Sequence, residues 1–223
     1  MRAALLLLSL AASAQAQPTA GAVVDAWRAG WARAERGAVE VAERSVHAFQ
    51  GPRGGREVVI EATVRYVPGE PPRRTVRRVE VGGREVDVRR GPDSGRRFRR
   101  AFGPAGRFVT QPPPLPDRLL AAPARDLSET RFEGAEAWRV TLGTEPGAST
   151  AWFTRSARVP RLLAIRTEHD GGAVTREIRF VRVDGLDLPA SVRASATVRQ
   201  RRRLRDYVVT LDVASAYSAH AVR

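Results

Sequence analysis

The chain has three histidines, His47, His169 and His220, the side chains best suited to transfer a proton or bind a metal ion at neutral pH. They stand in unrelated contexts: His47 lies in a strand-like segment, His169 borders a turn, and His220 is near the end of the sequence. None has a second ligand at the spacing of a zinc motif. We therefore predict no metal site and no histidine-based catalysis.

Other reactive side chains form no recognisable group. The sequence has no cysteine, no G-x-S-x-G elbow and no S-x-x-K motif, so it lacks the common nucleophile signatures. Asp184 and Asp187 flank a glycine turn, where acidic residues are common for backbone reasons. Neither Gly54-Gly55 nor Gly82-Gly83 leads into the Gly-Lys-Ser/Thr of a phosphate-binding loop. The sequence predicts a protein that is not an enzyme and needs no cofactor.

Apolar and aromatic side chains are the binding chemistry that remains. Cavities lined by such groups take apolar ligands, and burial of an acyl chain is favourable by about 0.8 kcal/mol per methylene. For the two tryptophans nearest the N-terminus, simple packing of a helix on a sheet is the alternative. We expect a hydrophobic cavity or its lid to be formed by Val24, Trp27, Trp31, Phe98, Phe102, Phe108, Leu115, Leu119, Trp138 and Trp152.

A helix is expected at about residues 20–36, because apolar residues recur there at spacings of three and four and place Trp27 and Trp31 on one face. Thr19 is a candidate N-cap and Gly37 a natural stop. This helix must pack its apolar face on the rest of the protein.

Beyond this helix, apolar and polar residues alternate, as they do in strands with one buried face. About nine to eleven strands are expected, joined by turns such as Gly82-Gly83, and no helix separates consecutive strands. We predict a mainly β (α+β) fold in which a single curved antiparallel sheet forms an unclosed half-barrel. The N-terminal helix and an irregular insertion would cover it.

The insertion, residues 91–125, is rich in Pro, Gly and Arg and includes Pro112-Pro113-Pro114, so it cannot be a central strand. It also carries more apolar side chains than a solvated linker needs. We expect a loop with one or two short helical turns that folds back over the sheet like a lid. A plain linker between two halves of the fold is the alternative.

Residues 1–16 have the three parts of a secretory signal peptide: Arg2, an apolar run from Ala3 to Ala12, and small residues that end at Ala16. The apolar run is much shorter than the roughly 20 residues that span a membrane. We expect this segment to be removed, leaving a periplasmic protein with one domain over residues 17–223.

The formal net charge is +14, and all 38 basic residues are arginine. Nucleic-acid-binding surfaces usually combine Arg with Lys, so the absence of lysine indicates a genomic composition bias, and we expect no nucleic-acid partner. A surface of this charge still favours anionic partners, including the head groups of phospholipid or lipopolysaccharide.

The second half of the chain, at about residues 150–215, resembles the periplasmic lipoprotein carriers of the LolA/LolB type and the wider outer-membrane lipoprotein-sorting family. The likeness rests on Trp152-Phe153, a strand after Pro160, a glycine hairpin, and the segment F-x-x-V-x-G-L-x-L-P from Phe180 to Pro189. The resemblance implies an unclosed barrel with a helical lid, and no cofactor. Carriers of this family close the lid with an arginine, but the sequence does not single one out.

The resemblance also implies a function. It predicts a lipoprotein-carrier-like domain that shelters the acyl chains of a lipoprotein or lipid during transfer towards the outer membrane. An inner-membrane release transporter and an outer-membrane acceptor would be its protein partners. An extracytoplasmic module of the same fold that senses lipids or lipoproteins is the alternative.

Overall fold

The structure is a computed structural model that describes residues 17–34, 37–52, 54–68, 70–87, 94–143, 148–155, 158–202 and 205–222. The expected signal peptide, residues 1–16, lies outside this part of the chain, as do residues 91–93 of the expected insertion.

The described chain contains three α-helices and a sheet of eleven strands. The helices are α1 (Ala20–Arg33), α2 (Ser94–Thr110) and α3 (Pro116–Leu119). The strands are β1 (Val39–Gly51), β2 (Gly54–Tyr66), β3 (Arg73–Val81), β4 (Arg84–Val86), β5 (Ala124–Phe132), β6 (Ala135–Leu142), β7 (Ser149–Thr154), β8 (Leu162–His169), β9 (Val174–Val183), β10 (Leu186–Arg202) and β11 (Arg205–Val222).

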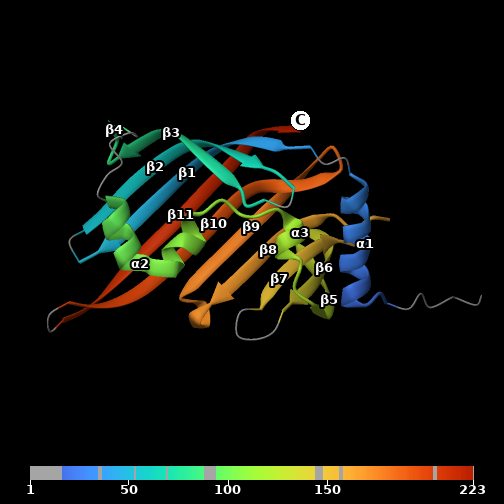
Figure 1. Cartoon of the computed structure of the whole chain (residues 1–223). Helices are drawn as coiled ribbons and strands as arrows, with labels where there is room; N and C mark the ends of the chain where they lie inside the picture. Colours follow the sequence, from blue (N-terminus) through green and yellow to red (C-terminus); the bar gives the residue numbers. More distant parts are fainter. Residues whose placement is uncertain are drawn as a thin grey trace, which may run out of the picture.

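All strands belong to one antiparallel sheet with the order β4-β3-β2-β1-β11-β10-β9-β8-β7-β6-β5. Neighbours in the sheet are also neighbours in sequence, except for β1 and β11, whose long pairing joins the first four strands to the last seven. The edge strands β4 and β5 do not pair, so the curved sheet stays open (Figure 1). The prediction of a mainly β fold with one unclosed antiparallel sheet is confirmed.

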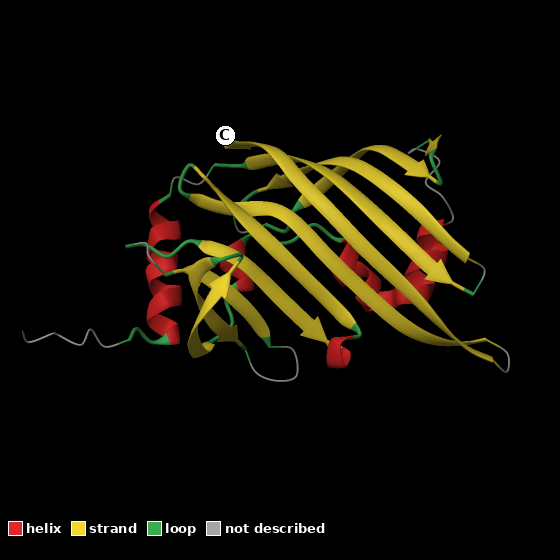
Figure 2. Ribbon diagram, turned by 180° about the vertical axis from the view of Figure 1, so that it is seen from behind, coloured by secondary structure: helices red, strands yellow, loops and turns green. Residues whose placement is uncertain are grey.

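The connection from β4 to β5 has to cross the whole sheet, because these strands are its two opposite edges. It crosses on the concave face as α2, a segment in which Pro112 and Pro113 are buried, and α3 (Figure 1). We call residues 94–123 the cover. Figure 2 shows the opposite, outer face of the sheet, over which neither α2 nor α3 lies.

The cover is more helical than predicted. Instead of one or two short turns, α2 runs for 17 residues in two pieces that meet at Gly103, where φ is 51° and ψ is −132°. Glycine tolerates this conformation and Pro104 begins the second piece, so the glycine and proline that argued against a helix form its kink. Burial of Phe102 before the kink and of Val109 after it stabilises both pieces of the helix against the sheet.

Helix α1 lies close to its predicted position. The hydroxyl of Thr19 accepts a hydrogen bond from the backbone N–H of Ala22 at 3.2 Å, as expected of an N-cap. The stacked rings of Trp27 and Trp31, with centroids 5.3 Å apart, are both buried. None of the helices in the described ranges is both long and apolar enough to cross a membrane.

A buried carboxylate fixes α1 to the sheet. The indole N–H of Trp27 donates to Oδ2 of Asp187 at 2.8 Å, and the same oxygen accepts the backbone N–H of Leu162 at 3.0 Å. Burial raises the pKa of Asp187, and these two hydrogen bonds oppose that effect. Asp187 is therefore more than the turn residue that the sequence suggested, because it joins α1, β8 and β10.

Replacing Trp27 with Phe keeps most of the ring but removes the N–H donor. Asp187 is 1% exposed and would lose one of its hydrogen bonds, so the free energy of unfolding in urea should fall by about 1–3 kcal/mol. The control Trp152→Phe, at a half-buried ring on the outer face, should lower it by less than about 0.5 kcal/mol. Equal losses in the two variants would contradict the anchoring role of Asp187.

Candidate functional site

The cover presents an apolar side to the concave face of the sheet. Helix α2 contacts β9, β10 and β11. The ring of Phe102 lies 6.2 Å from that of Phe49 on β1, and Phe108 meets His169 on β8 edge-on at 5.0 Å. In this conformation the side chains of α2 occupy the concave face.

Most of the predicted site residues meet in one apolar core, either buried in it or packed against it. These are Val24, Trp27, Trp31, Phe102, Phe108, Leu115, Leu119 and Trp138.

Two predicted residues are not placed in this core. Phe98 belongs to α2, but its side chain lies outside the described part of the structure. Trp152 lies on the outer face, because its neighbours Ala151 and Phe153 in β7 are the buried, inward-facing residues. Its ring contacts Phe132 at a centroid distance of 5.4 Å.

The structure has one small hollow on the concave side of the sheet and a larger one on its outer face. A hollow of about 20 Å³, lined in part by Trp31, Leu115 and Leu188, has room for roughly one water molecule. A larger hollow of about 410 Å³, with Arg166 and Asp212 in its lining, lies on the outer face of the sheet. Because Phe102 and Phe108 of α2 pack on the concave face, an acyl chain could lie beneath α2 only after the cover moves.

A group of polar side chains lies on the concave face beneath the C-terminal end of α2. It was not predicted from the sequence. We call it the polar cluster, and its members come from five strands: Glu43, Ser45 and His47 on β1, Tyr66 on β2, Arg74 on β3, Arg176 on β9 and Tyr217 on β11. All are buried except Arg74, whose side chain is 17% exposed.

The centre of the polar cluster is a bidentate ion pair. Nε of Arg74 donates to Oε2 of Glu43 at 2.6 Å, and Nη2 of Arg74 donates to Oε1. The hydroxyl of Tyr217 also lies 3.4 Å from Oε1 of Glu43, and Nη2 of Arg74 lies 3.4 Å from the hydroxyl of Ser45. Both carboxylate oxygens thus have donors, which offsets the cost of burying the charge.

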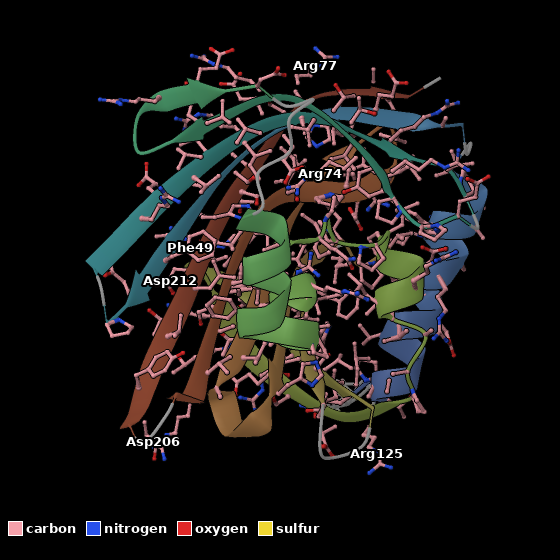
Figure 3. The ribbon with its side chains drawn as sticks, turned by 60° about the vertical axis from the view of Figure 1, so that its left-hand side comes forward. Phe49, Arg74, Arg77, Arg125, Asp206 and Asp212 are labelled. Carbon is pink, nitrogen blue, oxygen red and sulfur yellow. The ribbon has the colours of Figure 1, made fainter. Side chains whose placement is uncertain are left out.

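Two arginines of the polar cluster hold the end of α2. Nη1 of Arg74 donates to the carbonyl oxygen of Thr110 at 3.2 Å, and Nη2 of Arg176 donates to that of Gln111 at 2.6 Å. The ring of Phe108 lies over the Arg176 guanidinium at 5.4 Å. Figure 3 shows Arg74 beside α2. The C-terminal end of α2 is therefore fastened to β3 and β9 by two bonds from side chains to backbone.

His47 is neutral in this setting. Burial, with the nearby Arg74 charge, lowers its pKa from 6.5 to about 4. Nε2 of His47 lies 3.2 Å from the hydroxyl of Ser45. Within the described ranges, no three His, Asp or Glu side chains are placed to hold a metal ion.

The charges in the polar cluster do not balance. Glu43 contributes one negative charge, whereas Arg74 and Arg176 contribute one positive charge each. Burial lowers the pKa of Arg176 and raises the pKa of Tyr66 and of Tyr217, so both phenols stay protonated at neutral pH. The net charge of the polar cluster is therefore +1.

The depressed pKa of His47 predicts a stability that depends on pH. The unfolded state binds a proton near pH 6.5 and the folded state only near pH 4, so folding stability must fall as the pH drops through this window. Between pH 8 and pH 5 the loss from this group should be about 2 kcal/mol in urea denaturation. His47→Gln should remove this part of the pH dependence, whereas the control His220→Gln should retain it. An unchanged slope in His47→Gln would refute the assignment.

No protein-family model and no curated protein matches the sequence. Among solved structures, the chain is similar to one described as an outer membrane lipoprotein-sorting protein domain from Vibrio parahaemolyticus, with a TM-score of 0.48, 10% identity, and 90% of this chain and 92% of that chain covered. A DUF1329 family protein from Desulfovibrio piger gives a TM-score of 0.44 at 10% identity, with 92% and 94% covered.

The structure of a MucA/MucB complex from Pseudomonas aeruginosa gives a TM-score of 0.24 at 13% identity, with 86% of this chain and 93% of that chain covered. Because each TM-score is below 0.5, a function has to be argued from this chain's own residues. The first of these structures carries the same family description, outer membrane lipoprotein-sorting, as the resemblance noted in the sequence.

Proposed function

We propose that this protein is a periplasmic carrier that shelters the acyl chains of a lipoprotein or lipid between the cover and the concave face of the sheet, for transfer towards the outer membrane. One observation carries the proposal. An apolar floor is covered by a kinked helix whose described end is fastened to the sheet by two hydrogen bonds to backbone carbonyls.

The kink gives the cover a place to bend. Gly103 has a backbone conformation that glycine adopts far more readily than other residues, and Pro104 cannot donate a backbone hydrogen bond across the junction. The second piece of α2, which carries Phe108 and Val109, can therefore change its angle without melting the first piece. Hinges of this kind are common where a segment closes over a ligand.

The two hydrogen bonds that hold the end of α2 are within the energy that an acyl ligand can supply. A hydrogen bond from a charged donor contributes about 1.5–3 kcal/mol, so the bonds from Arg74 and Arg176 together contribute about 3–6 kcal/mol. Burial of about ten methylenes contributes about 8 kcal/mol. An acyl chain of ordinary length can therefore offset the loss of both bonds. Arg74 and Arg176 are the candidates for the lid-closing arginine that the family resemblance implies.

In this proposal residues 1–16 direct export and are removed, and acyl chains are the cargo. The protein partners would be an inner-membrane release transporter and an outer-membrane acceptor. The predicted apolar residues have two roles here. Trp27 and Trp31 help to fix α1 at the end of the sheet, whereas Phe102 and Phe108 occupy the acyl site until cargo displaces them.

A substitution that fills the proposed acyl site tests the proposal. Ala196 is buried on β10, the strand of the sheet that α2 contacts most, whereas its neighbour Thr197 is exposed on the outer face. Delipidated protein should bind a fluorescent fatty acid such as dansyl-undecanoic acid, and Ala196→Phe should weaken that binding by about tenfold or more, because the added ring fills the acyl site. Thr197→Phe should bind as the parent protein does.

Thermal unfolding of both variants should accompany the titration, to separate blocked binding from lost folding. A folded parent protein that binds no acyl probe would overturn the proposed function. A folded Ala196→Phe variant with unchanged affinity would place the acyl chain elsewhere.

A further inference from the structure

The polar cluster has a buried cation without a counterion. Glu43 is engaged by Arg74 through two guanidinium nitrogens. Arg176 is 6% exposed, and within the described chain it forms no ion pair; it donates to the Gln111 carbonyl, contacts the face of Phe108, and lies near enough to Glu43 for that charge to act on it. A buried charge is costly when no opposite charge is paired with it, so this arrangement needs a reason.

Two buried donors beneath the cover also have no acceptor among the residues that the structure describes. They are Nε of Arg176 and the hydroxyl of Tyr66, which is 1% exposed. The two side chains are near enough for the charge of Arg176 to act on Tyr66. Buried polar groups in native proteins are nearly always paired, and an unpaired set in one place indicates a missing partner. The partner that satisfies a cation and a hydroxyl donor is an anionic oxygen.

The carbonyl oxygens of Thr110 and Gln111 indicate where such an oxygen could sit. Each accepts a hydrogen bond, from Nη1 of Arg74 and from Nη2 of Arg176 respectively. When α2 lifts away, these two donors become available to a ligand. A carboxylate or phosphate oxygen accepts a stronger hydrogen bond from a guanidinium than a neutral carbonyl does. An anionic ligand would therefore compete well with the carbonyls of Thr110 and Gln111 for these donors.

We propose that Arg176, Tyr66 and Arg74 form a binding site for the anionic head group of an acyl lipid, a carboxylate or a phosphate, which replaces the carbonyls of Thr110 and Gln111 and so couples ligand binding to opening of the cover. This inference rests on the proposed function, since the acyl chain of the same ligand would lie on the apolar floor. The cargo class is then carboxylate- or phosphate-bearing acyl lipid rather than neutral acyl lipid.

Three ligands of equal chain length test the proposal: dodecanoate, dodecyl phosphate and neutral dodecanol, each titrated into the delipidated protein. We expect at least one anionic ligand to bind ten times or more tightly than dodecanol, and the two anionic arms to show whether carboxylate or phosphate is preferred. Arg176→Gln should reduce this preference to less than threefold without weakening dodecanol binding. Arg166→Gln, an exposed arginine on the outer face, should keep the preference.

Tyr66→Phe is the second variant, because it removes one hydroxyl and keeps the ring in place. It should weaken binding of the preferred anionic ligand about threefold to tenfold and leave dodecanol unchanged. Equal affinity of the parent protein for all three ligands would overturn the anion site while leaving an acyl carrier in place. Failure of all three to bind would overturn the proposed function as well. An anionic preference that survives both Arg176→Gln and Tyr66→Phe would also overturn the assignment.

Discussion

The fold depends on covering one face of a single large sheet. The two edge strands do not meet, so no barrel closure hides the concave side, and its row of apolar side chains has to be buried by something else. In this chain the face is covered by α1 and by the connection from β4 to β5, which has to cross the sheet in any case. A connection that crosses an apolar face for topological reasons can serve as a lid without any added domain.

The two covering elements are attached in different ways, and this difference supports the proposed function. Trp27 of α1 donates to Asp187, a buried carboxylate that also accepts a hydrogen bond from the backbone of β8. Releasing α1 would therefore leave a buried charge with fewer partners. The end of α2 is bound through its own carbonyl oxygens at Thr110 and Gln111. A ligand oxygen or water can replace a carbonyl acceptor. We infer that α1 stays attached to the sheet and that α2 can move away from it.

Much of the fold could be predicted because local patterns and tertiary packing agree. The spacing of Trp27 and Trp31 gave α1, and the paired glycines 82 and 83, both with positive φ, form the predicted hairpin turn. The length of helix α2 was underestimated because its Gly103-Pro104 pair is typical of loops. Contacts with β9, β10 and β11 stabilise it, and a single sequence does not reveal contacts between segments so far apart.

The polar cluster could be predicted only in part. Along β1, the positions that alternate with solvent-facing residues read Val39, Val41, Glu43, Ser45 and His47, so three polar residues stand where the period of two requires burial. That interruption is a visible signal of an inward-facing polar site. Its partners could not be identified from spacing, because the arginines that complete it come from β3 and β9 and are two among 38.

The central claim, that α2 opens when an acyl chain binds, can be measured directly because the chain has no cysteine of its own. Nitroxide labels on cysteines introduced at Arg107, exposed on α2, and at Thr197, exposed on the outer face of β10, would report the distance across the sheet by electron–electron double resonance. The account predicts one short distance in the delipidated protein and a population at longer distance that grows with added acyl ligand until the site is saturated. An unchanged distance distribution in protein that demonstrably holds bound ligand would contradict it.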